Sequence, residues 1–379
     1  MPDSTQNPAA IADTEFQAPE APRRTRLQEA WEELRRNGLA LSGMVVFVAF
    51  FLVAVSGLAL TSGVDPLLDP AQIRLQEKLR SPLSMPNTEL LSPEETPALG
   101  IYLLGTDDLG RDVFARMLQG SWVSLTVGFV AVGISVLLGI LMGGVAGYFG
   151  DLSIRSDHIL AAFIALAGVV IAAAGSPAIG AALLAAGTAW IALTSRGKRP
   201  AALGGVSVDT LIMRFVDIML CFPSFFLILT VVALLPASIY NIMIVIGLTS
   251  WMGAARFVRA EFLSLREQDF VTAARALGVS DWRIIFRHMI PNAVAPVLVS
   301  ATIGIATAIL TEAGLSFLGF GVPPPHATWG NILSDGKRFI FDAPWLTFVP
   351  GIAILIVVLS FNLFGEGLRD VLNPKLRER

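Results

Sequence analysis

Histidines are the first residues to inspect for metal binding or proton transfer in this sequence. The only three, His158, His288 and His326, lie far apart along the chain. No His-Glu-x-x-His pattern, which places two zinc ligands and a general base on one helix, is present. The sequence therefore predicts no metal site of the metalloprotease kind.

Patterns for nucleophilic catalysis and for ATP binding are also lacking. No Gly-x-Ser-x-Gly pattern surrounds Ser124, Ser224 or Ser316, and no Gly-x-x-x-x-Gly-Lys-Ser/Thr phosphate loop occurs. The single cysteine, Cys221, lies in an apolar run, so we expect a small buried hydrophobic residue rather than a disulfide. We therefore expect neither enzymatic activity nor a cofactor or metal bound by this chain.

The composition predicts a membrane protein. Hydrophobic residues make up 54% of the 379 residues and charged residues 15%, and the mean hydropathy is +0.68. Soluble domains have about 25% charged residues. The apolar residues form charge-free runs, and a helix needs about 20 such residues to cross a bilayer. We expect an all-α, polytopic bundle with eight membrane spans.

The boundaries of the regions follow from these runs. We expect an N-terminal tail at 1–38, a first span at 39–64, a proline-rich loop at 65–116 that is partly ordered at most, a main membrane region at 117–374, and a short tail at 375–379. The remaining spans are expected near 117–150, 159–174, 178–194, 210–235, 239–258, 289–311 and 343–365. The pair within 152–207 is a hairpin broken at Gly175 to Pro177.

The distribution of positive charge predicts the orientation. With the N-terminus in the cytoplasm, most of the 27 Lys and Arg residues fall in cytoplasmic segments, as positive-inside topology requires. The tails at 1–38 and 375–379 are then cytoplasmic, and the loop at 65–116 is extracytoplasmic.

The loop at 261–290 is too regular for a simple linker. Asp269 is a plausible N-cap, Gly278 suits a left-handed helix stop, Ser280 can cap a second helix, and Pro291 fits the first turn of the next span. A helical face is formed by Phe270, Ala273, Ala274 and Leu277. An eight-residue helix is marginal alone, so this face must pack on a cytosolic partner, on the protein's own spans or in the lipid interface.

Several polar and aromatic residues near span ends have two interpretations each. Asp217 and Glu312 are either solvated at the interface or functional carboxylates, and Arg214 can pair with Asp217 on one helix face. Trp329 and Trp345, near a proline-rich segment, are either interfacial anchors or contacts at the mouth of a pathway.

A resemblance to a known family rests on the loop at 261–290. The stretch AARALGVSDWRIIFRHMIPN, Ala273–Asn292, resembles the cytoplasmic loop motif of binding-protein-dependent ABC importer permeases. That motif has Glu-Ala-Ala, three residues, Gly, and later a hydrophobic residue before Pro. Thr272 stands at the Glu position. Six further segments resemble the dipeptide, oligopeptide and nickel subfamily, of the second permease subunit type, at 105–128, 147–151, 214–227, 312–333, 343–354 and 361–374.

This resemblance implies the fold of a type I ABC importer permease, with six core spans at 117–374 and before it, and with the hairpin at 152–207 as an insertion. It implies that a short helix at 272–287 couples the chain to a cytosolic ATPase. The residues that match or flank the motif are Thr272, Ala273, Ala274, Leu277, Gly278, Ile290 and Pro291.

The resemblance also implies a transport role. The chain would form half of the pathway for di- or oligopeptides or a related small solute, the alternative being nickel or another non-peptide solute. A second permease subunit, two ATP-binding subunits that use ATP and Mg²⁺, and an extracytoplasmic solute-binding protein are the implied partners, in the inner (cytoplasmic) membrane. Nothing in the sequence indicates nucleic-acid binding.

Overall fold

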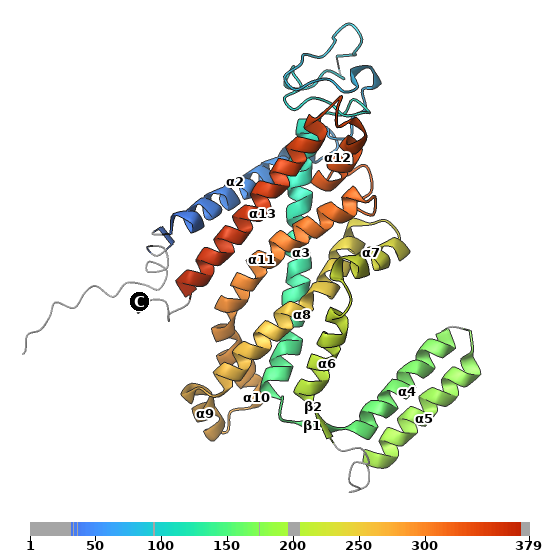
Figure 1. The fold of residues 1–379 in the computed structure, drawn as a ribbon, viewed down its shortest axis with the longest axis vertical. Coiled ribbons are helices and arrows are strands. Elements are labelled where there is room, and N and C mark those ends of the chain that lie inside the picture. Colours follow the sequence, from blue (N-terminus) through green and yellow to red (C-terminus); the bar gives the residue numbers. More distant parts are fainter. Residues whose placement is uncertain are drawn as a thin grey trace, which may run out of the picture.

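The computed structural model describes residues 37–372 except 94, 174 and 196–204, together with residues 32, 34 and 35. The expected tails, at 1–38 and 375–379, therefore lie almost entirely outside the described residues. The described chain is a tall helical bundle, with a layer of loops at one end and short helices at the other (Figure 1).

Within the part of the chain that the structure describes, five helices are long and apolar enough to cross a membrane. Each overlaps a predicted span, and each leaves large apolar side chains exposed, as a lipid-facing helix does. They are α2 (Gly38–Thr61), α3 (Val113–Tyr148), α8 (Ile239–Arg266), α11 (Ile290–Phe317) and α13 (Trp345–Leu372). The prediction of a multi-pass, all-α membrane protein is confirmed.

The predicted span near 210–235 is not one continuous helix. It consists of α6 (Val208–Leu220) and α7 (Ser224–Leu234), which are bent by 81° relative to each other. Pro223 lies in the break, where its ring removes a backbone donor and disfavours helix at the residue before it. Cys221 lies at this bend and is exposed, contrary to the expectation of a buried thiol.

Helices α3 and α8 pack through glycines that let their backbones approach closely. Gly139, Gly143 and Gly147 repeat every four residues on α3 and meet α8 at Ala254, at Ala255 and at the turn from Arg259 to Phe262. A Cβ atom at Gly147 would lie 2.6 Å from the Cβ atom of Phe262, closer than van der Waals contact allows. Small residues at this spacing are typical of helix pairs in membranes, where close backbone contact replaces hydrophobic driving force.

The segment at 65–112, expected to be partly ordered at most, instead forms a defined layer at one end of the bundle (Figure 1). Glu77 is fully buried, and its carboxylate accepts a hydrogen bond from the backbone N–H of Asn87 at 3.0 Å. Asp107 is also buried and pairs with Arg116 of α3 at 2.5 Å. The segment is more ordered than expected because its polar contacts also reach distant parts of the chain. Arg111 bonds to Asp335, which is 224 positions away.

Two tryptophans attach the C-terminal part of the chain to α3 and to this layer. Trp329 begins the short helix α12 (Trp329–Gly336), is 3% exposed, and donates from Nε1 to the Met117 carbonyl at 3.0 Å. Trp345 begins α13 and donates to the Thr106 carbonyl at 3.3 Å. Trp329 is therefore a packing residue rather than the lipid anchor or pathway contact considered from sequence.

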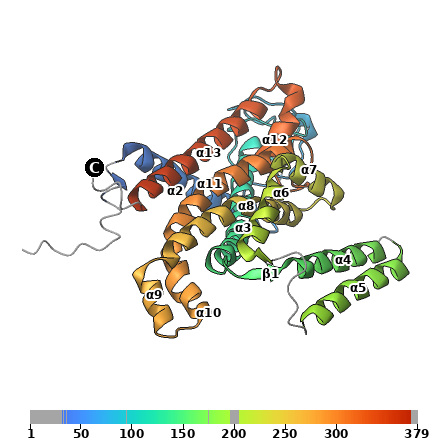
Figure 2. The same ribbon diagram turned by 60° about the horizontal axis from the view of Figure 1, so that its bottom comes forward.

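The inserted segment is a helical hairpin, as predicted. Strands β1 (Ser153–Arg155) and β2 (Gly205–Ser207) pair antiparallel at its base, and α4 (Ser156–Ala173) and α5 (Pro177–Ser195) run side by side away from the bundle (Figures 1 and 2). Both helices are shorter than the core spans. That they bring the spans to eight stays a prediction.

The glycine contact between α3 and α8 is testable with a matched pair of substitutions. Gly143→Leu places a side chain against the Ala255 backbone, whereas a Cβ atom at Gly133, also on α3, would have no heavy atom within 4 Å. We expect Gly143→Leu to lower the free energy of unfolding by about 1–3 kcal/mol or more, as overpacking does. Gly133→Leu should leave it unchanged or raise it, since leucine favours helix over glycine. Thermal unfolding of the detergent-solubilised protein measures both, and equal Tm values would contradict the contact.

Candidate functional site

The segment between α8 and α11 forms two short helices that project from the bundle at the end opposite the loop layer (Figures 1 and 2). Helix α9 (Asp269–Ala276) begins one residue earlier than expected, because Gln268 rather than Asp269 is the N-cap residue. Gly278 has a φ of 75°, which confirms the predicted left-handed stop. Helix α10 (Asp281–Arg283) follows Ser280, which is the N-cap residue but makes no side-chain capping bond.

One side of this segment packs against the protein itself. Val271 and Ala274 are buried in a cluster with Phe262 of α8 and with Ile284 and Met289. The predicted face of α9 is therefore partly wrong: its members Phe270 and Ala274 touch this cluster, but Ala273 and Leu277 do not. The inward direction is set by Val271, which sequence reasoning did not place on that face.

The opposite side of the segment is apolar and exposed. Leu277 is 83% exposed, and Ala273, one turn before it, is exposed as well. Trp282 and Phe286 are also exposed, and their rings stack with centroids 5.8 Å apart. Large apolar side chains exposed together are typical of a surface that contacts a partner protein or lipid. The alternatives left open by the sequence thus apply to different sides of one segment.

Tyr148, the last residue of α3, holds the segment in place. Its hydroxyl donates to the Asp281 carboxylate of α10 at 2.5 Å, and the Arg275 guanidinium of α9 lies 4.8 Å from the centre of its ring. One side chain at the end of α3 therefore contacts both short helices. An ion pair between Arg266 of α8 and Asp151, at 2.7 Å, joins the ends of α8 and α3 beside it.

The segment continues into the next span without a break. A π-helical turn, Ile284–Met289, joins α10 to α11, and the helical stretch runs from Asp281 to Phe317. Ile290 packs at the edge of the buried cluster, and Pro291 lies in the first turn of α11, as predicted. Pro291 has no N–H for the helical ladder, and the wider turn directly before it adjusts the hydrogen bonding. Helices α10 and α11 are thus parts of one continuous helical stretch.

The structure therefore separates the seven predicted residues by role. Thr272, Ala273 and Leu277 are exposed, Ala274 is buried, and Gly278 forms the stop between the two helices. The Thr272 hydroxyl donates to the Asp269 carbonyl at 2.9 Å and so leaves the outer surface unobstructed. Sequence reasoning missed Tyr148 and Asp281, because their contact joins residues 133 positions apart.

A second polar site lies near the loop layer. A cavity of about 490 Å³ there is lined in part by Asp108, Arg116 and Asp335. Burial raises the pKa of Asp108, and the nearby carboxylates of Asp107 and Asp335 raise it further. The two arginines that face these carboxylates are already paired, so this site joins the loop layer to α12.

Glu312 of α11 also departs from its predicted setting. Interfacial solvation was one of its two interpretations, but the side chain is fully buried. Its carboxylate accepts hydrogen bonds from Ser316 at 2.6 Å and from Ser124 of α3 at 3.3 Å. Glu312 thus links α11 to α3 within the bundle.

The role of Tyr148 is testable by removal of one hydroxyl group. Tyr148→Phe deletes the hydrogen bond to Asp281, so α9 and α10 should open more often. We expect amide hydrogen exchange over 269–283 to accelerate by about tenfold, the effect of losing one hydrogen bond to a charged group. Tyr240→Phe is the control, because that side chain is 71% exposed. Unchanged exchange in Tyr148→Phe would show that the hydrogen bond from Tyr148 to Asp281 does not hold the two short helices in place.

Comparisons with known proteins agree with this arrangement. Residues 197–378 match the family model described as "binding-protein-dependent transport system inner membrane component". Residues 25–82 match the model for the N-terminal TM domain of oligopeptide transport permease C. The matched regions include α9, α10 and every core helix after the hairpin.

Relatives cover nearly the whole chain. The dipeptide transport system permease protein of Alkalihalophilus pseudofirmus is 36% identical over 92% of this chain and 90% of its own length. The oligopeptide transport system permease protein of Bacillus subtilis is 30% identical over 93% and 90%. The dipeptide transport system permease protein of Haemophilus influenzae is 32% identical over 94% and 97%. The chain therefore belongs to the family of binding-protein-dependent transport system inner membrane components, the permease subunits of ABC importers.

Proposed function

We propose that this chain is a permease subunit of an ATP-driven peptide importer, and that an ATP-binding subunit covers its exposed apolar surface. We call the side chains of Ala273, Leu277, Trp282 and Phe286 the docking surface. The observation that carries the proposal is that this surface is apolar and exposed although the other side of the same segment is firmly packed. A segment that packs on the protein with one side and exposes the other can bind a partner and transmit the partner's movement to the bundle.

The orientation of the chain is part of this proposal. The docking surface lies at the opposite end of the bundle from the loop layer (Figure 1). ATP is available in the cytoplasm, so the docking surface and both termini are cytoplasmic, and the loop layer is extracytoplasmic. The excess of Lys and Arg in the segments at the docking end supports this orientation.

Peptides are the proposed substrate class. The relatives described above are named for dipeptide or oligopeptide transport. None of these names favours the alternative of nickel or another non-peptide solute. The chain provides a membrane path rather than a reaction, because its family consists of permeases and not of enzymes.

The proposed partners follow from what the chain itself does not provide. ATP and Mg²⁺ are bound and used by two separate ATP-binding subunits in the cytoplasm. A second permease completes the pathway, and an extracytoplasmic solute-binding protein delivers the peptide at the loop layer. The assembly lies in the inner, or cytoplasmic, membrane.

The geometry gives a route for coupling. Closure of the ATP-binding subunits moves α9 and α10, and the continuous helix from Asp281 to Phe317 carries that movement into the membrane. Tyr148 and the cluster around Val271 pass the same movement to α3 and α8. ATP binding can therefore favour one access state of the pathway because it changes contacts at this one segment.

The docking surface is tested by adding a carboxylate at two positions, one on the surface and one beside it. Leu277→Glu places a carboxylate at the centre of the apolar surface, so we expect binding of the ATP-binding subunits to weaken by about tenfold or more. Thr272→Glu adds the same charge at the position where the family motif has Glu, and should preserve binding and transport. Co-purification of the ATP-binding subunits and peptide uptake by proteoliposomes measure the two effects.

A third variant controls for the loss of an exposed leucine. Leu90 is 55% exposed in the loop layer, so Leu90→Glu should not affect binding of the ATP-binding subunits. Full binding and transport by Leu277→Glu would refute the proposed docking surface. Equal losses in all three variants would show a general effect of added charge and would refute it as well.

A further inference from the structure

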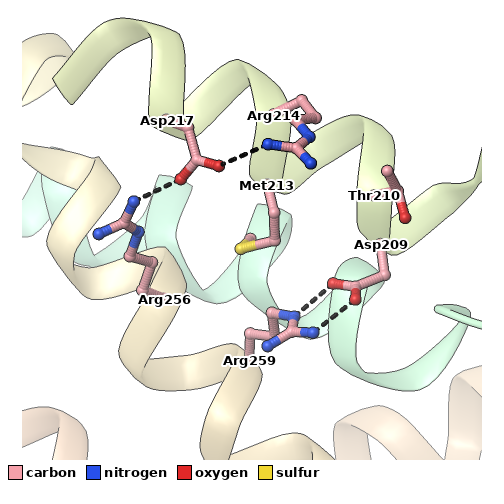
Figure 3. A pocket seen from close by; sticks show the side chains of 7 residues that line it. All are labelled: Asp209, Thr210, Met213, Arg214, Asp217, Arg256 and Arg259. Carbon is pink, nitrogen blue, oxygen red and sulfur yellow. Dashed lines mark hydrogen bonds and ion pairs between the residues drawn. The ribbon is translucent and has the colours of Figure 1, made fainter. Parts of the chain in front are cut away.

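A polar groove lies between α6 and α8, on the membrane side of the hairpin base. Its volume is about 460 Å³. Figure 3 shows its charged side chains facing one another across the two helices. We call it the α6–α8 groove, and its charged residues are Asp209, Arg214, Asp217, Arg256 and Arg259.

The groove contains more positive than negative side chains, so its ion pairs leave one positive charge without a full counter-charge. Arg259 makes a two-point contact with Asp209, and Arg256 contacts Asp217 (Figure 3). Arg214 reaches Asp217 only at 3.9 Å, and its side chain is 76% exposed. Asp217 is thus shared between two arginines. Three guanidinium groups face two carboxylates, so Arg214 presents a positive charge that the groove does not neutralise.

The groove lies at the cytoplasmic end of the spans and reaches along α6. Asp217 is nine residues beyond Val208, the first residue of α6, which corresponds to about 14 Å along the helix. The opposing residue Arg256 directly follows the charge-free part of α8. Charged side chains at the edge of a membrane span are costly in lipid and are found facing water or other protein.

The exposed side of α6 is also continuous. Arg214, Asp217 and Cys221 are spaced by three and four residues, so they lie on one helical face. Arg214 and Cys221 are exposed in the chain alone, and Asp217 is half-buried. This face ends at the bend between α6 and α7, where the span changes direction by 81°. A polar stripe that leads from the cytoplasmic end to a break in a span is suited to line an aqueous path.

We infer that the α6–α8 groove lines the cytoplasmic half of the translocation path and that Arg214 binds the terminal carboxylate of the passing peptide. This inference rests on the proposed function and adds the chemical group that the chain recognises. Every linear peptide with a free C-terminus carries this carboxylate whatever its side chains, so one guanidinium serves peptides of any sequence. Arginine forms two-point hydrogen bonds with carboxylates, and the nearby Asp217 keeps the binding weak enough for release.

Substrate pairs that differ only in the terminal group test the inference. The complete importer, reconstituted in proteoliposomes, is supplied with a peptide and with its C-terminal amide, at equal occupancy of the solute-binding protein. We expect Arg214→Ala to slow uptake of the free acid by about tenfold, the loss of one charged hydrogen bond, and to leave uptake of the amide unchanged. Arg214→Lys should recover part of the acid uptake. Arg338→Ala, at an exposed arginine near the loop layer, should affect neither substrate.

The outcomes separate this inference from the proposed function. A wild-type importer that moves neither peptide would refute peptide transport and with it this inference. Normal peptide transport with equal acid and amide rates in Arg214→Ala would refute the role of Arg214 alone. Equal slowing of both substrates would assign Arg214 to structure or to an anionic lipid headgroup, and would also refute carboxylate recognition.

The native thiol gives a second readout without further substitution. Cys221 is the only cysteine of the chain and lies on the same face as Arg214. In the complete importer we expect a cationic, membrane-impermeant methanethiosulfonate reagent to modify Cys221, and a transported peptide to slow the reaction. Modification by lipid-soluble maleimides alone would place this face in the bilayer and overturn the inference.

Discussion

The close contact between α3 and α8 is the constraint on which the rest of the structure depends. Glycines at 139, 143 and 147 bring the two backbones together, and no larger side chain fits at these positions without displacing α8. Helix α3 runs the height of the bundle, and α8 packs along its lower part (Figure 1). Near the loop layer, α3 receives Trp329 and Glu312 from the C-terminal half of the chain. At the opposite end, both helices hold the segment that carries the docking surface.

This arrangement explains how the proposed coupling can work through so short a segment. Helix α9 has eight residues and α10 has three, too few for stable helices in water. Their stability comes from Val271 and Ala274, which pack on α8, and from Tyr148, which contacts both helices from α3. The outer side is left free for a partner. In the proposed coupling, a push on that side moves α11 and the packed pair of α3 and α8.

Much of this fold could be predicted from sequence because its signals are local. Charge-free runs locate the five long helices, and the glycine at 278 locates the stop after α9. The bend between α6 and α7 escapes prediction because Pro223 lies within one continuous apolar run. The loop layer and the contact of Tyr148 with Asp281 escape it because they join distant residues, such as Arg111 with Asp335, for which the pattern of a single segment carries no signal. For the same reason the direction of α9 is only partly predicted.

The most direct test of the account asks what lies on the docking surface in the intact importer. With Cys221 replaced by serine, Ala273→Cys places a single thiol on the exposed side of α9. The account predicts that a short bifunctional thiol reagent joins this cysteine to an ATP-binding subunit in native membranes. It also predicts that the subunit protects the thiol from an impermeant maleimide in inside-out vesicles. A thiol that reacts freely with the maleimide while the ATP-binding subunits are bound, and that joins to none of them, would contradict the account.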